Sequence, residues 1–216
     1  GIKYGKVHAS SDMFQITVKG KHSHGAYPEM GVDAIVAAAQ IVTGVQSIVA
    51  RNISPLSPAV ITIGSIHGGT AVNLIADSVV LEGTIRALDH SGREYLKSRL
   101  REMAQYTAKA CGARADVKFK KGYPVLINDS LIADLVKNVA ICETAVEKVV
   151  ELKEPTMGVE DFAYFLEKVP GAFFFLGSGF KGRENEGLHS GGFEVDEKCI
   201  PIGIQLEVMS VLKLLE

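Results

Sequence analysis

Residues 12–20, DMFQITVKG, alternate apolar and polar side chains along their length. Phe14, Ile16 and Val18 fall on one side of an extended chain, and polar residues fall on the other. This alternation is typical of a β-strand that buries one face. The stretch therefore predicts a half-buried strand. The elements predicted around it indicate the type of sheet to which this strand belongs.

Five further elements are predicted after this strand. Apolar residues recur at helical spacing around 31–50, which predicts an amphipathic helix lying on a sheet. Ser91 followed by Glu94 has the pattern of a capping box, so a second helix is predicted to begin with Ser91 as its N-cap and to end before Gly112. Alternating or β-branched runs predict three more strands, at 59–69, 78–89 and 114–122. The order over residues 12–122 is β-α-β-β-α-β, the ferredoxin-like arrangement with two helices on one face of a small antiparallel sheet.

The pattern changes after residue 122. It predicts an α/β alternation with helices near 129–141, 159–168 and 198–215 and strands near 147–152 and 172–177. The apolar run AFFFLG at 172–177 predicts a strand buried on both faces. Two short strands and three helices are too few for a complete α/β domain. This part of the chain is therefore predicted to belong to a larger sheet.

The composition is that of an ordinary globular protein, with 216 residues, 47% hydrophobic and 22% charged. The net charge of −2 gives no electrostatic basis for binding nucleic acid. The 3 cysteines are far apart and form neither a disulfide framework nor a metal motif, which favours a reducing, cytoplasmic location. The longest uncharged run, residues 34–50, falls short of a membrane span, and no signal peptide is expected before it.

Two histidines stand close together in GKHSHGAYP, residues 20–28. On a strand, His22 and His24 would present both rings to one face, as a metal pair does. However, zinc takes three or four protein ligands, and no third candidate is near in sequence. A polar loop with surface histidines and a catalytic histidine at a strand end are the other two interpretations.

Two further residues suggest ligand binding, each with a structural alternative. Asn73, in GGTAVNLIAD, could donate its amide to a ligand or bond its own turn. Arg86, in GTIRALD, lies on the same strand face as Glu82 and Thr84. It could pair with a sheet-face carboxylate or hold a ligand carboxylate in a bidentate fork.

The C-terminal part also contains ionisable residues that are candidates for a functional role. Glu160 and Asp161 are adjacent at a predicted helix start, where the helix dipole favours acids for structural reasons alone. His189 lies in a glycine-rich loop before the last helix, and such a lone loop histidine usually has no functional role.

Five separated motifs taken together are more specific than any one of them. They are GKHSHGAYPEMGVDAI, GGTAVNLIAD, GTIRALD, MGVEDFAYF with the following VPGAFFFLGSG, and LHSGGFEVDE, in this order. The set resembles the M20 metallopeptidase family, and within it the amidohydrolase branch of N-acyl-amino-acid, hippurate and indole-acetyl-amino-acid hydrolases. The resemblance covers essentially the whole chain.

The resemblance implies an architecture. Residues 12–122 would be the ferredoxin-like lid or dimerisation domain, and residues 123–216 with 1–11 would be the C-terminal segment of a zinc-peptidase-like catalytic domain. The opening part of that domain, with most ligands to two divalent metal ions (zinc or manganese) and the glutamate general base, would lie outside this sequence, which does not begin with methionine.

The resemblance also implies residue roles. His24 matches a lid histidine that stabilises the oxyanion, Asn73 and Arg86 match residues that hold the substrate, and His189 matches a metal ligand. Arg86 would bind the amino-acid carboxylate. His22 stands where the family usually has glycine and is not expected to be a ligand.

The expected function is that of a fragment of a metal-dependent amidohydrolase that releases an amino acid from an N-acyl-amino acid or peptide-like substrate. The parent is expected to be a homodimer joined through the lid, without nucleic-acid or membrane partners. The chain alone is expected to be inactive and to bind no metal tightly. The alternative is a non-catalytic dimerisation or small-molecule-binding module built on the lid.

Overall fold

The computed structural model describes residues 1–144 and 146–216, which divide into two compact units. The sheet unit comprises His8–Leu126 and Thr156–Asp161. The helical unit comprises Gly1–Val7, Ile127–Pro155 and Phe162–Glu216.

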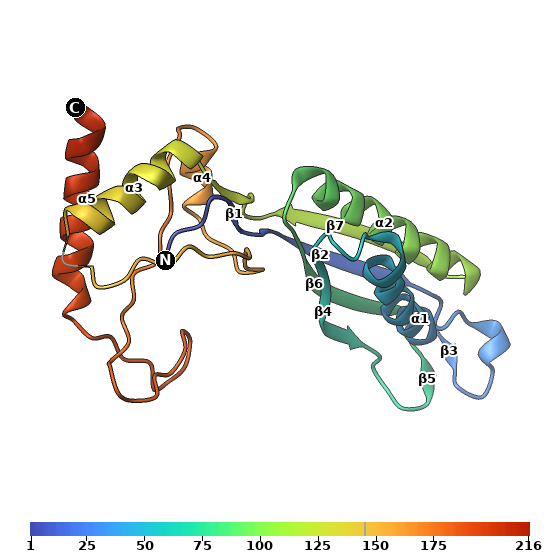
Figure 1. Ribbon diagram of the computed structural model, residues 1–216. Coiled ribbons are helices and arrows are strands. Elements are labelled where there is room, and N and C mark those ends of the chain that lie inside the picture. Colours follow the sequence, from blue (N-terminus) through green and yellow to red (C-terminus); the bar gives the residue numbers. More distant parts are fainter. Residues whose placement is uncertain (145) are drawn as a thin grey trace. The chain divides into compact units, whose positions relative to one another are not determined.

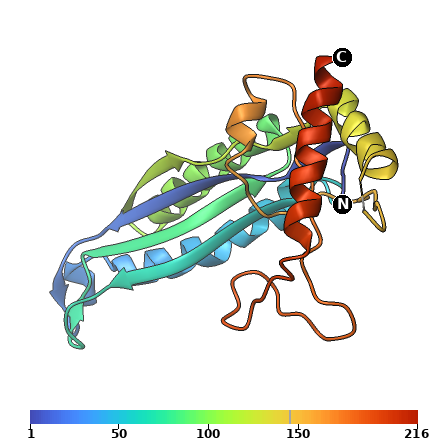
Figure 2. The ribbon, with the colours of Figure 1, turned by 90° about the vertical axis from the view of Figure 1, so that its left-hand side faces the viewer.

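A four-stranded antiparallel sheet forms the sheet unit, with the strand order β4-β6-β2-β7. Helices α1 and α2 pack side by side along one face of this sheet (Figures 1 and 2). The chain order of these elements confirms the predicted succession of strands and helices. Their bounds are β2 Ser10–Lys19, α1 Ala34–Ser47, β4 Ala59–Gly68, β6 Ser78–Ala87, α2 His90–Ala110 and β7 Arg114–Lys121.

The alternation in β2 has the predicted consequence. Phe14, Ile16 and Val18 are at most 3% exposed and face the helices. Gly83, opposite Phe14 on β6, is required by this packing. A Cβ there would lie 2.5 Å from Phe14 Cζ and 2.0 Å from the backbone oxygen of Thr62. A larger residue at this position would have to displace a neighbouring strand.

The helix caps agree with the prediction only in part. α2 begins one residue before Ser91, because Asp89 is its N-cap and accepts a hydrogen bond from Gly92 N–H at 2.7 Å. The prediction of Ser91 as the cap was therefore wrong; its hydroxyl bonds Asp89 instead. Gly112 has φ of 74°, the left-handed conformation that ends helices and that glycine adopts readily.

Helix α1 continues into one π-helical turn, η2 (Ile48–Asn52). Its 19 residues from Ala34 to Asn52 are long and apolar enough to cross a membrane by length and composition alone. Ala37, Ile41 and Val45 are nevertheless fully buried against the sheet. The apolar face of this helix therefore packs in the core of the sheet unit.

One end of the sheet unit carries short elements that were not predicted. β3 (Ser23–His24) pairs antiparallel with β5 (Leu74–Ile75), and the short 3-10 helix η1 (Pro28–Met30) follows β3. We call this end, residues 20–31 and 68–77, the tip (Figure 1). It lies beyond the β2–β6 pairing, which ends with Lys19 opposite Ser78.

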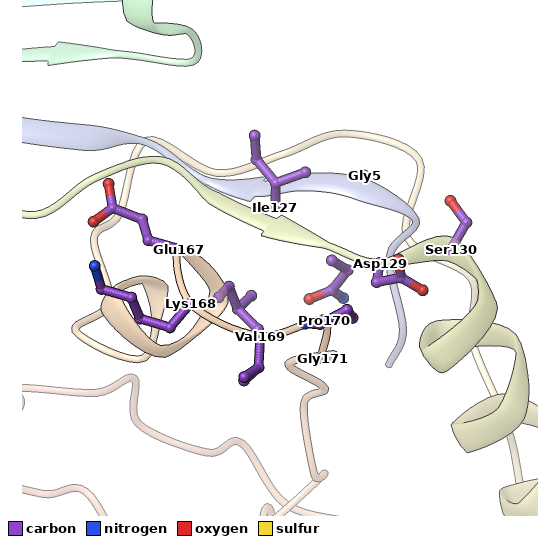
Figure 3. A pocket seen from close by; sticks show the side chains of 11 residues that line it. Gly5, Ile127, Asp129, Ser130, Glu167, Lys168, Val169, Pro170 and Gly171 are labelled. Carbon is purple, nitrogen blue, oxygen red and sulfur yellow. The ribbon is translucent and has the colours of Figure 1, made fainter. Parts of the chain in front are cut away.

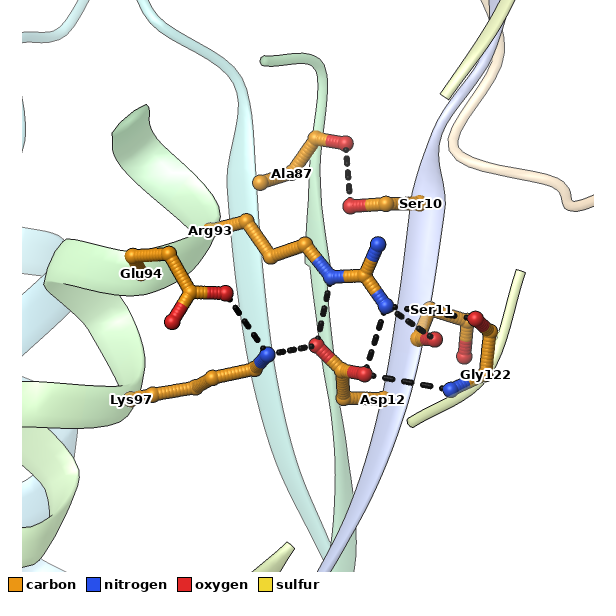
Figure 4. A network of polar contacts seen from close by, with 8 residues as sticks. All are labelled: Ser10, Ser11, Asp12, Ala87, Arg93, Glu94, Lys97 and Gly122. Carbon is orange, nitrogen blue, oxygen red and sulfur yellow. Dashed lines mark hydrogen bonds and ion pairs between the residues drawn. The ribbon is translucent and has the colours of Figure 1, made fainter. Parts of the chain in front are cut away.

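A buried ion-pair network lies near the other end of β2 (Figure 4). The Asp12 side chain is 0% exposed and accepts from Arg93 Nε and Nη2, both at 2.6 Å, and from Gly122 N–H at 3.1 Å. Lys97 Nζ lies 2.9 Å from the second Asp12 oxygen. The network joins α2 to β2 and to the end of β7.

The helical unit forms its strands at other positions than predicted. Its helices are α3 (Ser130–Cys142), the single turn α4 (Ala163–Leu166) and α5 (Cys199–Leu215), and β1 (Gly5–His8) pairs with β8 (Leu126–Asn128). The predicted strands at 147–152 and 172–177 were wrong, because each forms only an isolated bridge with Ile2. Residues 1–2 bond both segments, through Ile2 N–H to Val150 O, Leu152 N–H to Ile2 O and Phe175 N–H to Gly1 O, but these contacts are too few to form a ladder among the described residues.

Candidate functional site

His24 is held at the tip with its ring in a defined orientation. Its Nδ1 accepts a hydrogen bond from Ala26 N–H at 3.1 Å, and its ring lies 5.7 Å from the ring of Tyr27. Because Nδ1 accepts, the proton of a neutral ring is on Nε2. The side chain is exposed, so His24 presents an N–H donor to the outside of the unit.

Asn73 lies next to His24 although 49 residues separate them in sequence. The backbone oxygen of Asn73 accepts from Gly25 N–H at 2.8 Å, and His24 pairs with Leu74. The Asn73 side chain is exposed and makes no hydrogen bond to its own turn within the described residues. The tip therefore places two exposed donors close together, the His24 imidazole on β3 and the Asn73 amide one residue before β5.

Arg86 is half-buried on the sheet face that the helices leave open. Its Nη1 donates to the backbone oxygen of Met157 at 2.6 Å. Across residues 1–144 and 146–216 it has no carboxylate partner, so the alternative of a salt-bridged sheet-face arginine finds no support. A guanidinium has five N–H donors, so the bond to Met157 O leaves others that could bind an anion.

The tip and Arg86 lie at opposite ends of the sheet. Arg86 comes eight positions after Ser78, the first residue of β6, and the tip lies beyond Ser78. At about 3.4 Å per residue in an antiparallel strand, this separates them by roughly 27 Å. A single small substrate cannot contact His24 and Arg86 of the same sheet unit.

Segment 156–161 contacts Arg86 and contributes a residue that sequence reasoning missed. His8 Nδ1 lies 2.6 Å from Thr156 Oγ1. Burial lowers the pKa of His8, and the carboxylate of Glu160 partly opposes this shift. No sequence signal could have found the pair, because 148 positions separate its members.

Glu160 and Asp161 precede α4 by two or more residues and do not begin it. The Glu160 carboxylate accepts from Asp161 N–H at 3.0 Å, so one of its contacts is local.

His189 lies in the helical unit, in the loop before α5. It is exposed and has φ of 68°, a left-handed conformation that is uncommon outside glycine and frequent at functional sites. Among the described residues no group of three or more His, Cys, Asp and Glu could hold a metal ion. The donors present do not fit a two-metal site by themselves.

We expect the isolated chain to retain no stoichiometric zinc after dialysis against a weak chelator. One imidazole supplies far fewer ligands than the three or four that a stable site uses. Metal analysis of the dialysed chain tests this. One equivalent of zinc that is lost in a His189→Ala variant would contradict the expectation.

A pocket of about 610 Å³ lies in the helical unit, between β8, the start of α3 and residues 166–171 (Figure 3). It contains none of the predicted site residues. Asn128, which lines it, is fully engaged: it donates to Lys3 O and Phe173 O and accepts from Phe173 N–H. Because none of the predicted site residues lines it, the pocket is not part of the candidate site.

Comparison with known proteins identifies the sheet unit. Residues 8–110 match the M20 peptidase dimerisation domain. N-acetyl-L-cysteine deacetylase of Bacillus subtilis is 38% identical over 200 residues, which are 93% of this chain and 46% of that protein. The chain belongs to the M20 peptidase family.

Two solved structures share the fold of this chain. An aminohydrolase from methicillin-resistant Staphylococcus aureus superposes with a TM-score of 0.90 at 31% identity, covering 100% of this chain and 55% of that one. A dinuclear metal-binding M20 peptidase from Bacillus subtilis gives 0.78 at 29% identity, covering 99% and 52%. The chain spans about half the length of the relatives it matches.

Proposed function

We propose that this chain supplies the lid and the closing segment of a metal-dependent M20 amidohydrolase. The substrate would be an N-acyl-amino acid or a similar amide, and the product a free amino acid. The observation that carries the proposal is the pair of complementary ends on one sheet unit. Outward N–H donors lie at the tip, and an arginine without a carboxylate partner in the described chain lies at the opposite end.

Each end matches one part of such a substrate. The Arg86 guanidinium would hold the carboxylate of the amino-acid product by charge-assisted hydrogen bonds. The His24 Nε2–H would donate to the oxygen of the acyl carbonyl, where negative charge develops during attack on the amide. Asn73 would provide a second amide donor beside it.

The ends are too far apart to serve one substrate within a single chain. We infer that the tip of one subunit completes the site that contains Arg86 of another. The strand order β4-β6-β2-β7, with helices on one face, supports the interpretation of this unit as a ferredoxin-like lid that mediates the pairing.

The two sheet edges differ in their suitability for pairing. β7 carries charged residues at five of eight positions, a pattern that blocks edge-to-edge association. β4 carries no Asp, Glu, Lys or Arg over ten residues, and Ile66 on it is 53% exposed. We propose β4 as the edge that extends the sheet across a two-fold axis.

The general base and the remaining metal ligands would come from outside this chain. When bound, the two divalent ions would activate the water that attacks the amide. In this chain, His189 is the residue proposed to contact one of them.

Replacing Arg86 with alanine in the full-length protein tests the carboxylate assignment. We expect kcat/KM to fall roughly ten- to a hundred-fold, because a charge-assisted pair worth about 1.5–3 kcal/mol is lost. Steady-state kinetics with an N-acyl-amino acid measure the effect.

A substrate analogue with an amidated carboxylate is the control. It has no anion for Arg86 to bind, so the Arg86→Ala loss should largely disappear with it. Equal losses for the two substrates would mean that Arg86 has a structural role only.

A non-catalytic dimerisation or small-molecule-binding module is the second candidate. The family match to a dimerisation domain over residues 8–110 favours it specifically. The two proposals differ in one observation: an upstream reading frame that carries the missing ligands supports the enzyme, whereas a native start near residue 1 supports the module.

A further inference from the structure

The turn Thr156–Gly158 is fastened to the start of the sheet by its backbone. Ala9 N–H donates to Thr156 O at 3.2 Å and to Gly158 O at 3.0 Å, and His8 forms a parallel bridge with Thr156. Between these two anchored carbonyls, Met157 O points to Arg86 and accepts from Nη1 at 2.6 Å.

Side chains close the turn from the other side. Thr156 Oγ1 accepts from Gly158 N–H at 3.1 Å and bonds His8 Nδ1 at 2.6 Å. A Cβ on Gly158 would lie 3.1 Å from Thr156 Oγ1 and 3.4 Å from His8 Nδ1, so the turn is closely packed against the imidazole. His8 thus orients the Thr156 hydroxyl, and this hydroxyl bonds the Gly158 amide within the turn.

We propose that His8 is a positioning residue for Arg86. His8 fixes the Thr156 hydroxyl, the hydroxyl fixes the turn, and the Met157 carbonyl of the turn fixes one edge of the guanidinium. A long arginine side chain loses rotamer freedom when it binds an anion, and a guanidinium already held by a carbonyl has less freedom to lose. The functional consequence rests on the proposed role of Arg86 in binding the substrate carboxylate.

The physical part of the proposal can be tested in this chain by NMR hydrogen exchange. In His8→Leu, which cannot bond Thr156, we expect the Gly158 amide and the Arg86 guanidinium protons to exchange roughly three- to ten-fold faster. His8→Asn places an oxygen or amide nitrogen near the position of Nδ1 and should keep both rates close to those of the unchanged chain. The Leu81 amide, in the centre of the sheet, is the internal control and should not change.

A second pair of variants tests the same contact if His8→Leu fails to fold. Thr156→Val removes the hydroxyl and should reproduce the faster exchange, whereas Thr156→Ser retains it and should not. Unchanged exchange at Gly158 and Arg86 in the folded His8→Leu or Thr156→Val protein would overturn the proposal. Equal acceleration at Leu81 would also overturn it, because His8 would then act on global stability alone.

Kinetics of the full-length protein test the functional part separately. We expect His8→Leu to raise KM for the carboxylate substrate several-fold with kcat nearly unchanged, and His8→Asn to restore KM. If Arg86→Ala raises KM for the carboxylate substrate but His8→Leu does not, the positioning role of His8 is contradicted and the proposed function stands. If Arg86→Ala has no effect either, the proposed function fails.

Discussion

Asp12→Ala is expected to lower the free energy of unfolding of the sheet unit by about 3–5 kcal/mol. The carboxylate is 0% exposed, and its two main partners, Arg93 and Lys97, have side chains only 6% and 16% exposed. Arginine cannot lose its proton in a protein, so removing Asp12 leaves a buried, uncompensated charge. Urea unfolding followed by circular dichroism measures the loss.

Asp116→Ala is the matched control. Asp116 also pairs with two cations, Lys19 at 3.6 Å and Arg114 at 2.9 Å, but these side chains are 60% and 77% exposed. Exposed pairs contribute little because water and salt screen them. If Asp12→Ala and Asp116→Ala reduce stability equally, the buried network does not stabilise the unit.

The same network predicts a dependence of stability on pH. Burial alone would raise the pKa of Asp12, but the hydrogen bonds from Arg93, Lys97 and Gly122 outweigh burial and hold it at about 2, below the usual 3.8. A carboxylate with a depressed folded pKa stabilises the fold above its unfolded pKa. About 2 kcal/mol should therefore be present above about pH 4 and be lost as the pH falls towards 2. Urea titrations across this range should show a shallower decline in Asp12→Asn.

His24→Ala in the full-length protein is expected to reduce kcat roughly 100- to 1000-fold, the loss typical of removing one donor to an oxyanion. His22→Ala is the matched control. His22 is also exposed and lies two positions earlier, one residue before β3, so its loss should cost little. Comparable losses in the two variants would contradict a specific role for His24.

Mixing subunits tests whether His24 acts across the dimer. The roughly 27 Å between the tip and Arg86 means that one lid cannot supply both contacts. When a His24→Ala subunit is mixed with a His189→Ala subunit, each mixed dimer regains one site with both residues intact. Random assortment makes about half of the dimers mixed, so roughly a quarter of the activity should return.

The control for this experiment is subunit exchange, followed independently with differently labelled subunits. No recovery of activity after demonstrated exchange would exclude a role of His24 across the dimer.

Regular elements with a strong period were predictable from sequence. The alternation around Phe14, Ile16 and Val18 set the buried face of β2, and helical spacing after residue 31 located α1. These patterns are local, because burial of one face repeats every two or about 3.6 residues. The failed strands at 147–152 and 172–177 show the limit: apolar sequence indicates burial, but a strand also needs a partner for its backbone.

Candidate residues could be named from motifs, but their arrangement could not. His24, Asn73 and Arg86 each lie in a recognisable motif. The pairing of β3 with β5 brings His24 close to Asn73, and the length of β6 keeps Arg86 far from both. His8 had no motif at all. Hydrogen bonds such as His8–Thr156 and Asp12–Arg93 join residues 148 and 81 positions apart, and chain folding alone brings their atoms within reach. Local sequence determined the strongly periodic strands and helices of the sheet unit. Tertiary packing decided which polar groups meet, because that depends on how the strands pair and not on spacing along the chain.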